Sequence, residues 1–392
     1  MNMNERQKLL LAAIPSSDSE PINWDALRAA GLAQLFLEME KTAQEPEYHG
    51  EGSVMEHTRL VCEALVMERE YKEYSSEDKA VVFLAALLHD IGKIRCTLLD
   101  GGKISSPHHS AVGAVMAREL LIRDFGFSGT SKLQSLRESI LSLIRYHSFP
   151  PYAIKAENSE LRLLKIASNG SLASRFSIRR LCLLGRADVL GRISADKDEY
   201  LERVEYCEMA ASELSCLDGP HKFPSEFSQR AFFREKTKWL GQEMFKDSWG
   251  EVILMSGLPA SGKDTWIKEN CSDLPVISLD EIRERLHISP TDEQGAVIAE
   301  AHGRAREYLR KKQPFVWNAT NITARMRAKQ ISLFEEYHAS VRTVYLEASW
   351  EEQLRRNGER EAEVPARVME RMLSKLEPPE RFESESVAWI TT

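Results

Sequence analysis

The sequence predicts a chain of two domains, an all-helical domain followed by an α/β domain with a parallel sheet. At 392 residues the chain is long enough for more than one hydrophobic core. Residues 1 to about 215 show helical patterns with few β-type runs. From Gly250 on, short apolar runs alternate with helical patterns, which is typical of parallel strands joined by helices.

The composition narrows the class of protein. The formal net charge is −8, so any contact with nucleic acid must be local rather than spread over a basic surface. No stretch reaches the roughly 20 apolar residues that a membrane helix needs. The six cysteines are scattered without a C-x-x-C pair, which suits a reducing compartment. We therefore expect a cytoplasmic protein with no membrane partner.

Capping and stop signals set the helix boundaries of the N-terminal part. Ser53-Val-Met-Glu56 is typical of a capping box that opens a helix. Gly92 stops a later helix, and Pro150 with Pro151 ends another. The expected helices run over 53–68, 77–91, 109–124, 132–147 and 178–190.

The pattern changes near Asp218-Gly-Pro220, which marks a domain boundary. The strands expected after it are Glu251–Ser256, Val276–Leu279, Phe315–Trp317 and Val341–Leu346. We assign residues 1–218 to the helical domain, 219–248 to a bridging segment and 249–392 to the α/β domain.

Polar side chains within two apolar helices need strong partners. His89 and Asp90 close an apolar helix, where burial without a partner is costly. Asp188 lies in a second apolar helix, and an ion pair with Arg186 or Arg192 explains it as well as a metal does. Imidazole and carboxylate groups are good ligands for divalent ions, so these residues are candidate metal ligands.

Six residues follow the order found in a known family: His57, His89, Asp90, His109, His147 and Asp188. With Leu88-His-Asp-Ile-Gly-Lys93 at its centre, the region of about 45–195 resembles the HD superfamily of metal-dependent phosphohydrolases, whose fold is all-helical. The resemblance implies one metal ion on His57, His89, Asp90 and Asp188. A second ion would be held by His109 and His147, with Asp90 bridging. His109 is preferred to His108 because its spacing to Gly113 fits the family.

Two such ions would lower the pKa of a bound water and offset charge on a phosphoryl group. Manganese, nickel, cobalt, copper and zinc all suit these ligands. Lys93 follows the helix end, where its ammonium is either a contact to the substrate phosphate or a solvated surface group. His49 is a further residue that could reach the site from the preceding loop.

A phosphate-binding loop follows the first expected strand. Its candidate nucleotide-binding residues are Gly257, Ser261, Gly262, Lys263, Asp264 and Thr265. A G-x-x-x-x-G-K core between a strand and a helix cradles phosphates with backbone N–H groups, and its lysine reaches the outer phosphates. Asp264 stands where a serine or threonine normally contacts magnesium. We expect Asp264 to hold the ion through a water, with Thr265 as the alternative ligand.

Further residues complete a transfer site. Asp280 ends a strand near the loop, where a carboxylate can accept the proton of an attacking hydroxyl. Together with Ala319-Thr-Asn321, the arginines that follow and Val364-Pro365, this set resembles the 5′-polynucleotide kinases of the phage end-healing type over about 250–380. The resemblance implies Asp280 as general base and Arg283 as a contact to the substrate phosphate. It also implies that Arg360, helped by Arg356, stabilises the transferred phosphoryl. Asn318 stands in a stretch where the family often has a carboxylate.

The order of the two motif sets resembles the bacterial HD–polynucleotide kinase proteins of RNA end healing. The resemblance implies removal of 2′,3′-cyclic phosphate and 2′-phosphate ends by the first domain. It also implies transfer of a phosphate from ATP or another NTP, with magnesium, to a 5′-hydroxyl RNA end by the second, before a separate RNA ligase acts. Two alternatives stay open: a signal-nucleotide hydrolase fused to a small-molecule kinase, and a P-loop half that only senses nucleotides.

Overall fold

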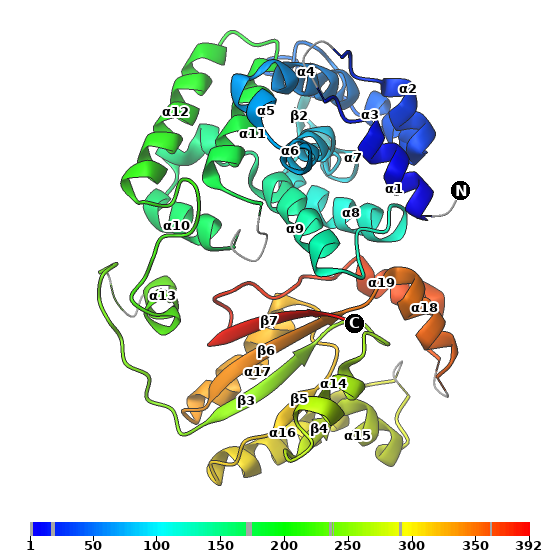
Figure 1. The fold of residues 1–392 in the computed structure, drawn as a ribbon, viewed down its shortest axis with the longest axis vertical. Coiled ribbons are helices and arrows are strands. Elements are labelled where there is room, and N and C mark those ends of the chain that lie inside the picture. Colours follow the sequence, from blue (N-terminus) through cyan, green and yellow to red (C-terminus); the bar gives the residue numbers. More distant parts are fainter. Residues whose placement is uncertain are drawn as a thin grey trace. The chain divides into compact units, whose positions relative to one another are not determined.

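The computed structural model describes residues 3–16, 20–169, 175–234, 237, 239–289, 292–360 and 363–392. The chain divides into two compact units (Figure 1). The first consists of Met1–Ser128 with Lys132–Lys222, and the second of Gly129–Ser131 with Phe223–Thr392. The segment 219–248 is shared between them, because its residues from Phe223 on, including helix α13 (Glu226–Phe233), belong to the second unit.

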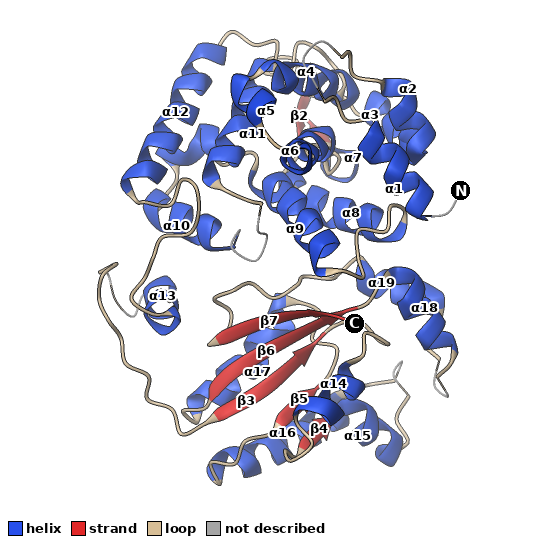
Figure 2. Ribbon diagram, viewed as in Figure 1, coloured by secondary structure: helices blue, strands red, loops and turns tan. Residues whose placement is uncertain are grey.

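The first unit is mostly helical (Figure 2). Its elements are α1 (Met3–Ala12), α2 (Trp24–Leu27), η1 (Arg28–Leu32), α3 (Ala33–Lys41), α4 (Val54–Met67), α5 (Arg69–Glu73), α6 (Ser76–Leu88), α7 (Lys93–Cys96), β1 (Leu98–Asp100), β2 (Lys103–Ser105), α8 (His109–Arg123), α9 (Ser131–Tyr146), η2 (Pro150–Lys155), α10 (Ser159–Asn169), α11 (Ile178–Leu190) and α12 (Lys197–Glu213). The helical class expected from the sequence is confirmed, with one short hairpin added.

Helix α6 forms the centre of this unit. Residues Val81 to Leu88 are buried on every side of the helix, as expected of a helix that is apolar all round. Ser75 caps its start by accepting a hydrogen bond from the backbone N–H of Asp78. The helix ends at Leu88, three residues before the predicted end, because the chain turns there into α7. This turn places His89 and Asp90 in the interior.

The hairpin of β1 and β2 was not predicted. The strands pair in antiparallel register, with Asp100 opposite Lys103. Gly101 and Gly102 form the turn with φ of 55° and 81°, a backbone region that favours glycine. Each strand has three residues, which is too short for an alternating pattern to be recognised in the sequence.

The second unit is built on a five-stranded parallel sheet in the order β4-β5-β3-β6-β7. The strands are β3 (Glu251–Ser256), β4 (Val276–Ser278), β5 (Val316–Asn318), β6 (Ser340–Glu347) and β7 (Ser386–Thr391). Its remaining helices are α14 (Lys263–Asn270), α15 (Leu279–Leu286), α16 (Gly295–Arg310), α17 (Ala324–Glu336), α18 (Trp350–Gly358) and α19 (Ala366–Leu373). The predicted α/β class with a parallel sheet is confirmed.

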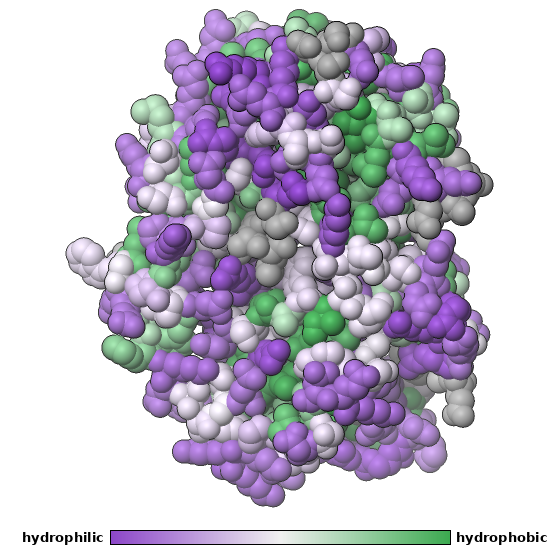
Figure 3. Space-filling view, in the orientation of Figure 1, coloured by the Kyte–Doolittle hydropathy of each residue, from purple (hydrophilic) through white to green (hydrophobic). Residues whose placement is uncertain are grey.

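Strand β3 is buried on both faces of the sheet. Val252 and Leu254 belong to a hydrophobic cluster with α16 and α17, whereas Ile253 and Met255 belong to a cluster with α14 on the other face. Figure 3 shows hydrophilic side chains over the outer side of the sheet's helices. The sequence analysis missed strand β7, which lies at the edge of the sheet and is half-buried throughout.

Candidate active sites

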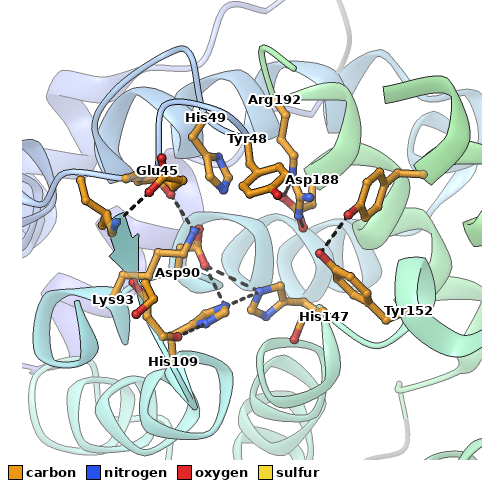
Figure 4. A pocket seen from close by; sticks show the side chains of 16 residues that line it. Glu45, Tyr48, His49, Asp90, Lys93, His109, His147, Tyr152, Asp188 and Arg192 are labelled. Carbon is orange, nitrogen blue, oxygen red and sulfur yellow. Dashed lines mark hydrogen bonds and ion pairs between the residues drawn. The ribbon is translucent and has the colours of Figure 1, made fainter. Parts of the chain in front are cut away.

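The structure brings the six predicted metal ligands together inside the first unit. Figure 4 shows four of them: Asp90, His109, His147 and Asp188. His57 comes from α4, His89 and Asp90 follow α6, and His109 is the first residue of α8. The other two are His147, directly after α9, and Asp188 in α11. Residues up to 131 positions apart in the chain thus meet at one point.

Hydrogen bonds fix how three of the imidazoles face the centre. The Nδ1 atoms donate to backbone carbonyl oxygens three residues earlier: His89 to Ala86 at 2.7 Å, His109 to Ser106 at 2.8 Å and His147 to Ile144 at 2.7 Å. A carbonyl can only accept, so Nδ1 carries the proton and Nε2 keeps its lone pair. This is the tautomer that a metal ligand needs, set by a backbone partner as in known metal sites.

Asp90 lies between two pairs of imidazole nitrogens. Its Oδ2 is 3.3 Å from Nε2 of His89 and 3.8 Å from Nε2 of His57. Its Oδ1 is 3.4 Å from Nε2 of His109 and 3.6 Å from Nε2 of His147. Asp188 adds a second carboxylate to the His57 side, at 3.0 Å. The cluster therefore has two centres that share one carboxylate.

The residues fit a pair of divalent ions. The Nε2 atoms of His57 and His89 are 3.4 Å apart, and those of His109 and His147 are 3.3 Å apart. Lone pairs that face each other at this distance repel unless a cation or proton lies between them. Asp90 Oδ1 is buried and accepts no hydrogen bond from any described residue, a costly state for a carboxylate oxygen that a metal would relieve.

In most of the cluster, electrostatic interactions favour the protonation states in which histidine and aspartate side chains bind metal ions. Burial, together with the neighbouring His89 and His109, lowers the pKa of His147 to about 3. Burial raises the pKa of Asp90, but Lys93 and His89 outweigh it and hold this pKa well below its ordinary value. Neutral imidazoles and ionised carboxylates are the forms that bind metals.

Asp188 and His57 share a strong interaction. Burial lowers the pKa of His57, but its contacts with Asp188 and Glu51 outweigh burial and raise the pKa above its ordinary value. The second oxygen of Asp188 accepts from Arg192 at 2.8 Å, whereas Arg186 pairs with glutamates elsewhere. Asp188 thus has the arginine partner considered as an alternative, and it also faces the cluster.

Lys93 is not a solvated surface residue. It is only 8% exposed, and its Nζ donates to Asp90 Oδ2 at 2.7 Å and to Gln44 Oε1 at 2.6 Å. It lines a cavity of about 400 Å³ over the His/Asp cluster, which His49 also lines. The solvated alternative is therefore excluded, and the ammonium is positioned at the wall of the cavity.

Glu51 is a residue that the sequence analysis missed. Its Oε1 is 2.8 Å from Nδ1 of His49 and 2.8 Å from Nδ1 of His57, and its Oε2 accepts from the backbone N–H of Ile193 at 2.9 Å. These bonds overcome burial and hold the pKa of Glu51 well below its ordinary value. Glu51 thus places a carboxylate oxygen 2.8 Å from Nδ1 of His57, on the side of the ring where the other three have backbone carbonyls. A carboxylate between two glycines next to the helix cap was the available signal.

The phosphate loop lies at the middle of the sheet in the second unit, between β3 and α14. Gly257 has φ of 145°, and a Cβ there would lie 2.5 Å from the carbonyl oxygen of Leu346. Lys263 Nζ donates to the carbonyl oxygens of Gly257 at 3.0 Å and Leu258 at 2.8 Å. Only glycine fits the close approach at 257, and the loop leaves backbone N–H groups for phosphates at the start of α14.

Comparison with protein families agrees with the two domains. The family described as HD domain matches residues 54–171, and the family described as AAA domain matches residues 252–379. The chain is an HD domain followed by a P-loop domain. This order is that of the HD–polynucleotide kinase fusions, and the second unit has the P-loop kinase fold. Asp188 lies outside the matched HD segment, and α11 brings it to the cluster.

In the P-loop domain, Asp264 lies on the exposed side of α14 and Asn318 ends β5. Asn318 Nδ2 donates to Asp264 Oδ1 at 2.7 Å, so the two departures from the usual pattern lie side by side. Thr265 is exposed in the first turn of α14. Gly262, the residue before α14, has φ of 91° and lies near the guanidinium of Arg356.

Asp280 and Arg283 lie on α15, after β4, at the edge of the sheet where the phosphate loop lies. Asp280 is 74% exposed and pairs with Arg283, whose Nε also donates to Gln294 at 2.7 Å. Arg356 on α18 donates to Glu352 at 2.6 Å and Thr392 at 3.0 Å.

Lys263 responds to this surrounding charge. Burial lowers its pKa to about 8, with Asp264 and Asp280 acting in the opposite direction and Arg360 adding to the effect of burial. The charges of Asp280 and Arg360 therefore both act on the loop lysine. In the part of the chain that the structure describes, no helix has the length and apolarity to cross a membrane.

Proposed function

We propose that this chain repairs RNA ends. Its HD domain removes 2′,3′-cyclic phosphate and 2′-phosphate ends, and its P-loop domain transfers the γ-phosphate of ATP or another NTP to a 5′-hydroxyl. The observation that supports it most is a two-centre His/Asp cluster in the same chain as a phosphate loop that has a carboxylate, Asp280, within electrostatic range of its lysine. A separate RNA ligase would join the healed ends.

In the HD domain, His57, His89 and Asp188 would hold one divalent ion, His109 and His147 the other, and Asp90 both. Manganese, nickel, cobalt, copper and zinc suit these ligands. The ions would supply Lewis acidity, activating water and neutralising phosphoryl charge. Lys93 lines the same cavity and would contact the phosphate.

Hydrolysis of the cyclic phosphate takes place in two steps. A water oxygen bonds to phosphorus, one P–O bond of the cyclic ester breaks, and the freed ribose oxygen takes a proton, leaving a phosphate monoester. A second water oxygen then bonds to phosphorus, the remaining P–O bond to the ribose breaks, and that ribose oxygen takes a proton, so that inorganic phosphate is released. The neutral pair His109 and His147 and the ionised Asp90 are set for this chemistry at neutral pH.

In the P-loop domain, Asp280 would accept the proton of the 5′-hydroxyl. The hydroxyl oxygen bonds to the γ-phosphorus, the bond from this phosphorus to the β–γ bridging oxygen breaks, and the nucleoside diphosphate leaves. Magnesium, when bound, would offset the charge on the phosphates. Lys263 would neutralise the outer phosphates, and Arg360 with Arg356 the transferred group. Arg283, held by Asp280 and Gln294, would contact the acceptor's phosphate.

A signal-nucleotide hydrolase joined to a small-molecule kinase is the second candidate. Incubation with labelled ATP and either a 5′-hydroxyl RNA or a 5′-hydroxyl mononucleoside distinguishes the two. We expect label on the RNA and little on the nucleoside. Arg283 would contact the phosphate next to the hydroxyl, and the nucleoside has no such phosphate. Label on the nucleoside alone would support the second candidate, and no label on either would support a nucleotide sensor.

A further inference from the structure

Two cavities of the HD unit follow each other along the same two elements. Element η2 carries Tyr152 in the wall of the cavity over the His/Asp cluster and Lys155 in the wall of a second cavity of about 410 Å³. Helix α12 does the same, with Tyr200 at the first cavity and Arg203 and Tyr206 at the second. The two cavities are therefore neighbours along η2 and α12.

The first cavity is lined by charged residues at the His/Asp cluster and by tyrosine side chains. Tyr48 and Tyr152 are 44% and 43% exposed, and both line it. Figure 4 shows Tyr152 beside His147, with Lys93 on the other side of the cluster. A nucleotide fits this arrangement, because it has a phosphate for the cluster and a base whose face stacks on aromatic side chains.

The second cavity suits a base better than a phosphate. Tyr206 is 45% exposed and Ile154 is 50% exposed, so both offer apolar surface. Glu199 and Glu202 also line this cavity, and Arg203 is already paired with Glu199, so the charge there is not strongly positive. A neutral, flat group with N–H donors fits such a surface, and a second phosphate does not.

The spacing agrees with two separate bases. Tyr200 and Tyr206 are six residues apart on α12, which corresponds to about 9 Å along the helix axis. This exceeds the ~3.4 Å between stacked bases of a nucleic-acid strand, so the two bases would be held apart. Proteins that read single-stranded RNA commonly hold unstacked bases on aromatic side chains in this way.

We propose that the HD unit binds a polynucleotide 3′ end across both cavities, with the terminal nucleotide in the first and the preceding base against Tyr206 in the second. The inference rests on the proposed hydrolysis of RNA ends and deepens it: the base before the terminal nucleotide has a subsite of its own. Stacking of one more base should raise the efficiency of hydrolysis several-fold or more.

The test is a length series of substrates with a 2′,3′-cyclic phosphate: a mononucleotide, a dinucleotide and a trinucleotide. For the unaltered protein, kcat/KM should rise about tenfold from mononucleotide to dinucleotide and little after that. Tyr206→Ala should reduce this rise to less than about threefold. Met209→Ala, on the next turn of α12, is the matched control, because Met209 is 64% exposed and lines neither cavity, and it should keep the full rise.

An unaltered protein that shows no rise, or a Tyr206→Ala variant with the full rise, would overturn the inference while leaving end healing intact. If no cyclic phosphate is hydrolysed at all, the proposed function fails, and binding then decides the inference. A fluorescein-labelled trinucleotide should bind Tyr206→Ala at least fivefold more weakly than Met209→Ala. Equal binding by the two variants would overturn it. Melting curves of both variants check that each is folded.

Discussion

At the scale of single residues, Asp264 and Asn318 reverse the order of residue types that is usual at two positions of a P-loop site. There, a hydroxyl follows the loop lysine and a carboxylate ends a neighbouring strand, and both hold magnesium. Here the carboxylate of Asp264 follows the lysine and the amide of Asn318 ends the strand. Asn318 Nδ2 lies 2.7 Å from Asp264 Oδ1. The negative charge around a bound magnesium ion would therefore be similar, although it would come from the other side.

We predict that Asp264→Ser raises the magnesium concentration needed for half-maximal ATP binding by roughly tenfold, which corresponds to about 1.4 kcal/mol. Adding Asn318→Asp to this variant restores the usual arrangement and should recover most of the loss. Calorimetric titration of ATP at several magnesium concentrations measures both effects. Thr265→Val is the control, and a large effect of Thr265→Val with a small effect of Asp264→Ser would show that the threonine holds the ion.

Lys263 gives a pH prediction. Its pKa of about 8 in the free protein means that the ammonium loses its proton above pH 8, whereas bound phosphates would favour the charged form. The nucleotide complex then binds more protons than the free protein, so ATP affinity should fall as pH rises from 8 to 9, by up to tenfold per pH unit. Calorimetry at pH 8.5 in two buffers of different ionisation enthalpy should also detect proton uptake. Release of protons, or an affinity independent of pH, would contradict the assignment.

At the scale of elements, the turn after α6 and the start of α8 pack too closely for a side chain. A Cβ on Gly92 would lie 2.0 Å from the carbonyl oxygen of His109 and 2.6 Å from the backbone nitrogen of Gly113. This contact explains the spacing of His109 and Gly113 in the sequence. Gly113 allows the helix that begins at His109 to approach the turn that carries Asp90.

Gly92→Ala should therefore displace α8 and move His109 away from Asp90. In the unaltered protein, His109 Nε2 lies 3.4 Å from Asp90 Oδ1. We expect the metal content of the purified protein to fall from two ions per chain towards one, with loss of phosphohydrolase activity. Gly113→Ala is the graded comparison, because its Cβ would lie 3.2 Å from Gly92 and needs a smaller shift. If Gly92→Ala keeps two ions and full activity, the close packing does not position the second centre.

The sequence predicted the elements that bear strong local signals. Helix α4 begins after Ser53, whose oxygen accepts from the backbone of Glu56 as the capping box requires, and α11 has the predicted bounds. The hairpin was missed because strands of three residues are too short for a distinct periodicity. Glu51 was missed because its role depends on contacts with His57 and Ile193 that only the folded chain forms.

At the scale of the whole molecule, each candidate site draws its residues from one unit. All six His and Asp residues of the cluster lie in the first unit, and the phosphate loop with Asp280 and its arginines lies in the second. Removing one activity should therefore leave the other intact. This independence makes it possible to test both proposed activities in one reaction.

The most direct test uses a single RNA that has a 2′,3′-cyclic phosphate at one end and a 5′-hydroxyl at the other, incubated with ATP, magnesium and manganese. The unaltered protein should yield RNA with a 3′ end free of phosphate and a 5′-phosphate, identified by mass spectrometry. Asp90→Asn should yield only the 5′ phosphorylation, and Asp280→Asn only the healed 3′ end. Full healing of the 3′ end by Asp90→Asn, or an RNA left unchanged at both ends by the unaltered protein, would contradict the account.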